Sequence, residues 1–262
     1  GEHIYTIVEY IPTGAQTTSD GKKVLDGVIY DQTSCQVTVT VTDNGDGTLT
    51  AKPSYPVSKN QVSFTNEYVP APTKYAPAVS KTLTGHELPD AKKNFTFTLT
   101  ADDDNPEGAT LPEDKTATVS FENKQEGTAP GSANFGNITF TKGGTYTFTI
   151  AENPGTEDGY TYDTTQWTLT VVVTDNLDGT LSIGNAHTYK SSNKDVQENT
   201  TEAKFTNDYT PASTSAQLAV SKTVTGAPMA KAEKFTFTQS LVNEPVDGVT
   251  MPEQNRVEIT VE

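Results

Sequence analysis

Apolar and polar residues alternate with a period of two along most of the chain, for example over residues 95–99 and 146–150. A β-strand points successive side chains to opposite faces, so this alternation predicts strands that bury one face. Comparable runs between residues 76 and 210 fall at 79–83, 117–121, 138–140, 167–173, 181–183 and 205–207. Seven or eight short strands of this kind in about 135 residues indicate an immunoglobulin-like β-sandwich.

Turn signals and composition agree with an all-β protein. Asp-Gly pairs at 46–47 and 178–179 favour tight hairpins. Residues 43–47 have a weak likeness to a calcium-binding loop, but the ligand spacing and the twelfth-position Glu are missing, so a hairpin turn is predicted instead. The chain is rich in Thr, Gly and Asn and concentrates helix formers nowhere.

Several sequence blocks occur twice, at a spacing of about 141 residues. VSKTLTG at 79–85 returns as VSKTVTG at 220–226, and SFTNEY at 63–68 returns as KFTNDY at 204–209. Such self-similarity predicts a tandem array of β-sandwich domains. We therefore predict the C-terminal part of one repeat at 1–69, a complete repeat at 76–210 and the N-terminal part of a third at 217–262. Two linkers that contain Pro, Ala, Ser or Thr, at 70–75 and 211–216, would join them. The chain also reads as a piece of something longer.

Charge and cysteine content remove several classes of function. The formal net charge of −16 argues against binding to nucleic acid or to anionic membranes, and no stretch is apolar enough to span a bilayer. The single cysteine, Cys35, excludes an internal disulfide framework and a multi-cysteine zinc site. Cys35 has the parity of neighbouring valines, which predicts a small core residue. No metal or cofactor is expected.

Three polar residues occupy positions of core parity: Lys81, Glu152 and Asn207. Burial lowers the pKa of a lysine and raises the pKa of a glutamate. A neutral lysine amine is a nucleophile, and a protonated glutamic acid can polarise an Asn side chain and protonate the leaving ammonia. One hypothesis is therefore an isopeptide bond between the first and last strands of the repeat.

A second hypothesis needs no covalent chemistry. Lys81 and Glu152 would form an ordinary salt bridge near the edge of the sandwich, and Asn207 would cap a turn. Lys92 and Lys93 are alternative amines, although they belong to a polar stretch, 86–94, that is expected to be a loop. Parity alone leaves both hypotheses open.

The ordered motifs resemble the isopeptide-bonded pilin repeats of Gram-positive bacteria, which include streptococcal backbone pilins and are related to CnaB-type domains. The resemblance is carried by K-T-L/V-T-G at 81–85 and 222–226, the FTF strand, the Y-T-F-T-I-x-E strand ending at Glu152, and the closing F-T-N-x-Y. It implies that Lys81 is the amine, Asn207 the acceptor and Glu152 the catalytic acid. The matching residues of the incomplete repeats are Glu9 and Asn66, whose lysine would precede residue 1, and Lys222.

The function expected from this resemblance is structural. The chain would be a stalk domain of an extracellular fibre or cell-wall-anchored adhesin, with one self-crosslinking reaction and no multiple-turnover enzyme activity. The alternative is a ligand-binding adhesin module for a host protein or glycan. Trp167 has core parity and the acidic stretch 101–110 is expected to be a solvated loop, so neither of them indicates a ligand-binding site. The expected partners are neighbouring copies, either in a longer continuous fibre or head to tail with Lys222 facing Asn66 of the next chain.

Overall fold

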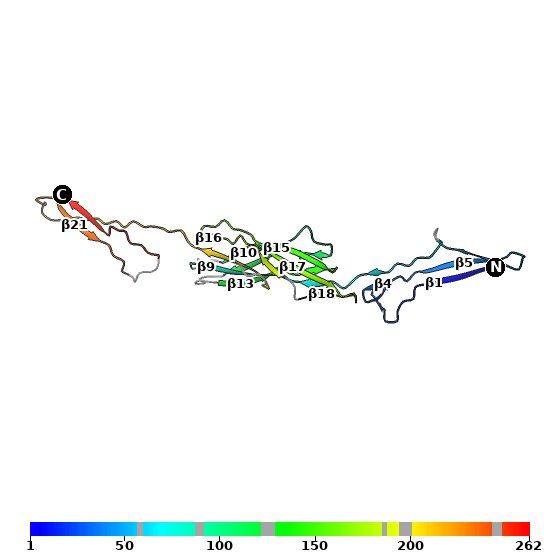
Figure 1. Ribbon diagram of the computed structural model, residues 1–262. Coiled ribbons are helices and arrows are strands. Elements are labelled where there is room, and N and C mark those ends of the chain that lie inside the picture. The colour runs from blue at the N-terminus through cyan, green and yellow to red at the C-terminus, as the bar shows by residue number, and fades with distance from the viewer. Residues whose placement is uncertain (57–59, 87–91, 122–128, 185–187, 194–200, 243–247) are drawn as a thin grey trace. The chain divides into compact units, whose positions relative to one another are not determined.

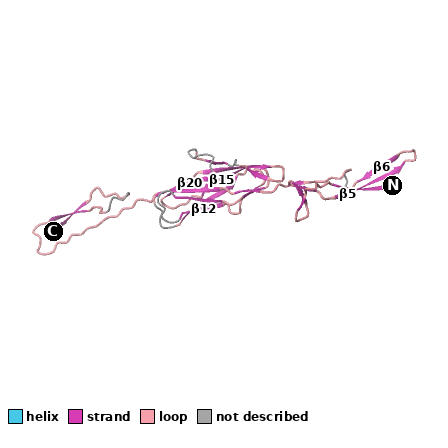
Figure 2. Ribbon diagram, turned by 90° about the horizontal axis from the view of Figure 1, so that it is seen from below, coloured by secondary structure: helices cyan, strands magenta, loops and turns pink. Residues whose placement is uncertain are grey.

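The computed structural model describes residues 1–262 apart from 57–59, 87–91, 122–128, 185–187, 194–200 and 243–247. The described residues form β-strands, turns and loops without a helix, which confirms the predicted all-β class (Figure 2). The chain divides into two compact units, Gly1–Ala212 and Ser213–Glu262. In the described part, no helix offers the length and apolarity needed to cross a membrane.

The complete repeat contains two main sheets (Figure 1). The first has the order β12-β10-β15-β17-β18, with β19 also paired to β17. Its strands are β10 (Lys93–Ala101), β12 (Thr116–Phe121), β15 (Gly144–Glu152), β17 (Gln166–Asp175), β18 (Leu181–Ile183) and β19 (Thr188–Ser191). The second has the order β13-β9-β20-β16, made of β9 (Ala78–Gly85), β13 (Ala129–Asn134), β16 (Tyr160–Thr161) and β20 (Ala203–Tyr209). A small third sheet joins β8 (Thr73–Tyr75), β11 (Ala109–Thr110) and β14 (Ile138–Phe140).

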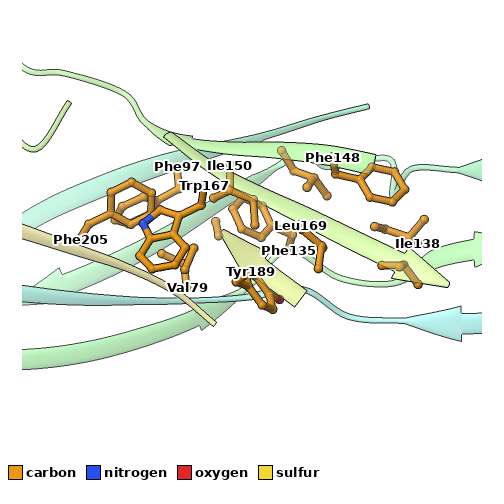
Figure 3. Packing of buried hydrophobic residues seen from close by; sticks show 14 of the residues in the cluster. Val79, Phe97, Phe135, Ile138, Phe148, Ile150, Trp167, Leu169, Tyr189 and Phe205 are labelled. Carbon is orange, nitrogen blue, oxygen red and sulfur yellow. The ribbon is translucent and has the colours of Figure 1, made fainter. Parts of the chain in front are cut away.

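The two main sheets share one hydrophobic core. Burial alternates residue by residue along β10, β15 and β17, as the period-two pattern predicts. Trp167 is fully buried, and its Nε1–H donates to the Lys204 carbonyl at 2.9 Å. Phe97 of one sheet and Phe205 of the other contact each other with ring centroids 4.9 Å apart and ring planes tilted by 41°, beside Trp167 (Figure 3). The core therefore ties the sheet that carries Glu152 to the sheet that carries Lys81 and Asn207.

The first and last strands of the complete repeat are neighbours. β20 pairs with β9 in parallel, and the register places Phe205 opposite Lys81 and Asn207 opposite Leu83. Parallel neighbours need a long crossover connection, and here nearly the whole domain supplies it. A cross-link between these two strands would therefore join the two ends of the domain.

Residues 1–69 form two smaller sheets. One has the order β1-β5-β6, from β1 (Glu2–Val8), β5 (Ser34–Asp43) and β6 (Leu49–Ser54). The other has the order β2-β3-β4-β7, from β2 (Gln16–Thr17), β3 (Lys23–Leu25), β4 (Val28–Tyr30) and β7 (Glu67–Tyr68). Cys35 is half-buried rather than in a core as predicted, and every residue of its partner strand β1 is exposed, so the described residues do not enclose this sheet. The predicted hairpin at Asp46-Gly47 is present, and Gly47 has φ of 83°.

The second unit contains one hairpin, β21 (Glu233–Thr238) paired with β22 (Arg256–Val261). Residues 220–226 repeat the β9 sequence but are not in a strand here, and they are exposed. The β9 residues instead pair with β20 on one side and β13 on the other. This repeated sequence therefore forms a strand where neighbouring strands pair with it, since the strand preference of a segment depends on its context.

Candidate functional site

Lys81 lies in the middle of β9, enclosed by the core. Its neighbours Val79 and Leu83 point inward on the same parity, and the Lys81 side chain has no exposed surface. The Nζ atom lies 5.0 Å from the ring centroid of Phe95 and 6.0 Å from that of Phe97. Aromatic faces stabilise a cation but do not hydrate it, so the amine depends on a nearby polar partner.

Glu152, the last residue of β15, connects the amine to the amide. Its Oε2 accepts a hydrogen bond from Lys81 Nζ at 2.7 Å, and its Oε1 accepts one from Asn207 Nδ2 at 2.6 Å. Asn207 is also fully buried. The structure therefore brings together the three residues that the parity pattern selected, with the carboxylate between the other two.

Burial shifts both ionisable groups toward their neutral forms. Desolvation lowers the pKa of Lys81, and the hydrogen bond and charge of Glu152 only partly oppose this. Desolvation likewise raises the pKa of Glu152 against the opposing effect of Lys81. Both directions favour transfer of a proton from the lysine to the glutamate, which would leave a neutral amine beside a neutral acid.

The salt-bridge hypothesis matches part of this geometry. Lys81 and Glu152 are an ion pair at 2.7 Å, but they lie in the interior rather than near an edge. Asn207 does accept from a turn, because its Oδ1 receives the backbone N–H of Asp163 at 2.6 Å. Its amide nitrogen nevertheless faces Glu152, so one carboxamide takes part in both contacts.

Asp163 is a site residue that the sequence interpretation missed. Its backbone N–H donates to Asn207, and its carboxylate accepts from two backbone N–H groups, those of Thr165 at 2.8 Å and Thr206 at 2.7 Å. A sequence signal for it exists: Y-D-x-T occurs at 162–165 and again at 30–33. Asp163 lies in the turn between β16 and β17, so the alternation along the strands gave no reason to select it as a site residue.

The first, incomplete repeat contains the same arrangement without a lysine. Asn66 Nδ2 donates to Glu9 Oε1 at 2.6 Å, and the Asp31 N–H donates to Asn66 Oδ1 at 2.8 Å. Asn66 is exposed and lies just before β7, whereas the matching Asn207 is buried within β20. The reason is that the described residues within 1–69 include no strand equivalent to β9 that could cover it.

The alternative amines lie elsewhere. Lys93 opens β10 opposite Phe121, so the prediction that all of 86–94 is a loop was wrong there; residues 87–91 lie outside the described part. Strand pairing with β12 outweighs the polar composition of this stretch. Lys93 Nζ pairs with Glu157 and lies 4.6 Å from the ring centroid of Tyr160. Lys92 is exposed.

Lys222 is exposed in the second unit, with its Nζ 4.7 Å from the ring centroid of Phe235. This repeats the contact between Lys81 and Phe95 in the complete domain. Among the described residues, no group of three or more His, Cys, Asp or Glu side chains is arranged to hold a metal ion.

A comparison with protein-family models matches residues 1–69 and 77–210 to FctA, described as a Spy0128-like isopeptide containing domain. A search of curated proteins found no match. The matched residues include both sets of site residues described above, apart from Lys222.

Among solved structures, the major pilin protein T-13 of Streptococcus pyogenes is 22% identical, with a TM-score of 0.37 over 53% of this chain and 54% of that chain. A major pilin from Streptococcus pyogenes is 22% identical, with a TM-score of 0.39 over 51% and 50%. The major pilin protein T3.2 from the same species is 17% identical, with a TM-score of 0.19 over 81% and 68%. The chain thus spans about half the length of the first two.

Proposed function

Because this chain belongs to the FctA family of Spy0128-like isopeptide-containing domains, we propose that it is a shaft segment of a bacterial surface pilus. Its complete repeat cross-links itself through one bond between Lys81 Nζ and Asn207 Cγ. The observation that carries this proposal is the buried contact of Glu152 with both the amine and the amide. The location that follows is extracellular, on a fibre anchored to a Gram-positive cell wall.

The reaction that we propose is balanced without any added reagent. The Lys81 ammonium first gives a proton to the Glu152 carboxylate, and the neutral Nζ then attacks Cγ of Asn207. Glu152 donates its proton to Nδ2, which leaves as ammonia, and takes up the second proton released by the amine. Glu152 Oε1 is already 2.6 Å from the nitrogen that leaves. The products are one amide, one ammonia and a protonated Glu152.

The reaction consumes its own side chains, so the domain turns over once and is not an enzyme in the usual sense. The mechanical consequence follows from the β9–β20 pairing. Tension that enters through the first strand and leaves through the last would pass through the new amide instead of through the hydrogen bonds of the fold. The competing function, a ligand-binding adhesin module, gains no support from Trp167, which is buried.

Intact mass of the full chain tests the self-crosslinking. The wild-type chain should be lighter than its sequence by one ammonia, and a Lys81–Asn207 branched peptide should appear after digestion. Glu152→Ala should have the full mass, whereas the control Glu107→Ala, which removes an exposed carboxylate, should still lose ammonia. A wild-type chain of full mass with unlinked Lys81 and Asn207 peptides would refute the proposal.

A second candidate function rests on Glu9. Its Oε2 is buried without a hydrogen-bond partner among the described residues, whereas Oε2 of Glu152 accepts from Lys81. An unsatisfied buried oxygen costs free energy that an incoming amine would recover. We propose that the Glu9–Asn66 pair accepts Lys222 of a second copy, because residues 220–226 repeat the lysine strand. Copies would then be linked head to tail.

Two variants of the chain test the head-to-tail link. Lys222→Ala removes the amine and Asn66→Ala removes the acceptor, so each variant retains one half of the site. A mixture should give a covalent dimer on a denaturing gel, and either variant alone should give only monomer. A mixture that stays monomeric would mean that copies of this chain do not join in this way.

A further inference from the structure

The carbonyl oxygen of Asn207 has a fixed donor. The Asp163 backbone N–H lies 2.6 Å from Oδ1, while the nitrogen of the same carboxamide donates to Glu152. When an amine adds to Cγ, the C=O electron pair moves onto Oδ1, which becomes an oxyanion. A pre-positioned N–H at that oxygen stabilises the transition state more than the ground state.

The carboxylate of Asp163 holds this N–H in place. One oxygen accepts from Thr165 N at 2.8 Å, which closes the turn, and the other accepts from Thr206 N at 2.7 Å. Thr206 precedes Asn207 in β20, so the carboxylate ties the turn directly to the strand that carries the acceptor. The distance between donor and oxyanion is thereby set by one side chain.

The incomplete repeat repeats the arrangement independently. Asp31 N–H lies 2.8 Å from Asn66 Oδ1, and the Asp31 carboxylate accepts from Thr33 N and Thr65 N, both at 2.9 Å. Among the described residues, no lysine forms a hydrogen bond or ion pair with Glu9 or Asn66. The arrangement of donor and acceptor therefore forms without the amine, as a pre-organised feature of the Y-D-x-T turn.

We propose that the Asp163 backbone N–H is the oxyanion donor of the cross-linking reaction, and that the Asp163 side chain is the positioning residue for it. The inference rests on the proposed Lys81–Asn207 bond. The step needs no added reagent. As Lys81 Nζ bonds to Cγ of Asn207, the electron pair of the C=O π bond moves onto Oδ1, which accepts a hydrogen bond from the Asp163 N–H. The electron pair re-forms the C=O bond as ammonia leaves. The corresponding group of the first repeat is Asp31.

The test measures the rate of ammonia loss by mass in freshly synthesised full chains. Asp163→Ala releases the turn from β20 and should slow the reaction by about 10²-fold, the lower range for removal of an oxyanion donor. Asp163→Asn keeps one acceptor oxygen and should react at an intermediate rate. Asp178→Ala is the matched control, because Asp178 accepts from Thr180 N in a similar turn at the exposed hairpin. It should react at the wild-type rate.

A purely structural role for Asp163 predicts a different outcome. Each substitution is also made with Lys81→Met, which cannot react, so that its cost in unfolding free energy is measured separately. Chains that remain folded but cross-link slowly support positioning, and a folded Asp163→Ala or Asp163→Asn chain that reacts at the wild-type rate overturns it. If Asp163→Ala does not fold, Asp163→Asn decides alone. A wild-type chain that never loses ammonia would instead refute the proposed function.

Discussion

The stability that the cross-link adds can be measured by removing the amine alone. Lys81→Met keeps a similar volume against Phe95 and Phe97 and leaves Glu152 bonded to Asn207. The bond would close a loop between positions 81 and 207. In the chain-entropy model, closing a loop of that length stabilises the fold by about 5 kcal/mol, because the unfolded chain loses freedom.

For a domain of this size, a loss of about 5 kcal/mol lowers the unfolding temperature by about 15–20 °C. Trp167 is the only tryptophan of the chain and is fully buried in this domain, so its fluorescence reports this unfolding and no other. The control is Lys142→Met, which removes an exposed lysine that pairs with Glu107. It should unfold at the wild-type temperature.

The same experiment separates a cross-link from a simple buried ion pair. A cross-link acts on the unfolded state, so the wild-type chain should expose less surface on unfolding and show a smaller denaturant slope than Lys81→Met. An ion pair acts on the folded state and would leave the slope unchanged. Equal unfolding temperatures, or a lower temperature with equal slopes, would refute the reasoning from loop closure.

Three further outcomes are expected. In Lys81→Met, burial holds the pKa of Glu152 above its ordinary 4.5, so the folded state binds this proton more tightly than the unfolded state does. The free energy of unfolding, measured by denaturant titration, should therefore fall as the pH rises above about 4.5. Gly85→Ala places a Cβ 2.3 Å from the Tyr209 carbonyl at φ of 95° and should cost more than about 1 kcal/mol, measured by thermal unfolding. Phe97→Ala should cost about 3–5 kcal/mol in the same assay, through a cavity.

The sequence by itself determined which side chains face inward. Alternation with a period of two is a local property of the extended backbone, so Lys81, Glu152 and Asn207 could be assigned to the interior without knowing any partner strand. Burial of three polar groups is costly, so parity made their meeting one of two hypotheses, and the resemblance of the ordered motifs favoured it. The all-β class followed from the same local pattern, and the Asp-Gly turns from the backbone freedom of glycine.

Only the tertiary structure decided which groups touch. The parallel register of β9 and β20, the place of Lys93 in a strand, and the contact of Asp163 with the Asn207 oxygen all depend on pairing between segments far apart in the chain. The alternation along a strand shows which face a side chain lies on, but not which residues of other strands it contacts. The exposure of Asn66 has the same origin, since an inward parity buries a side chain only where another strand is present to cover it.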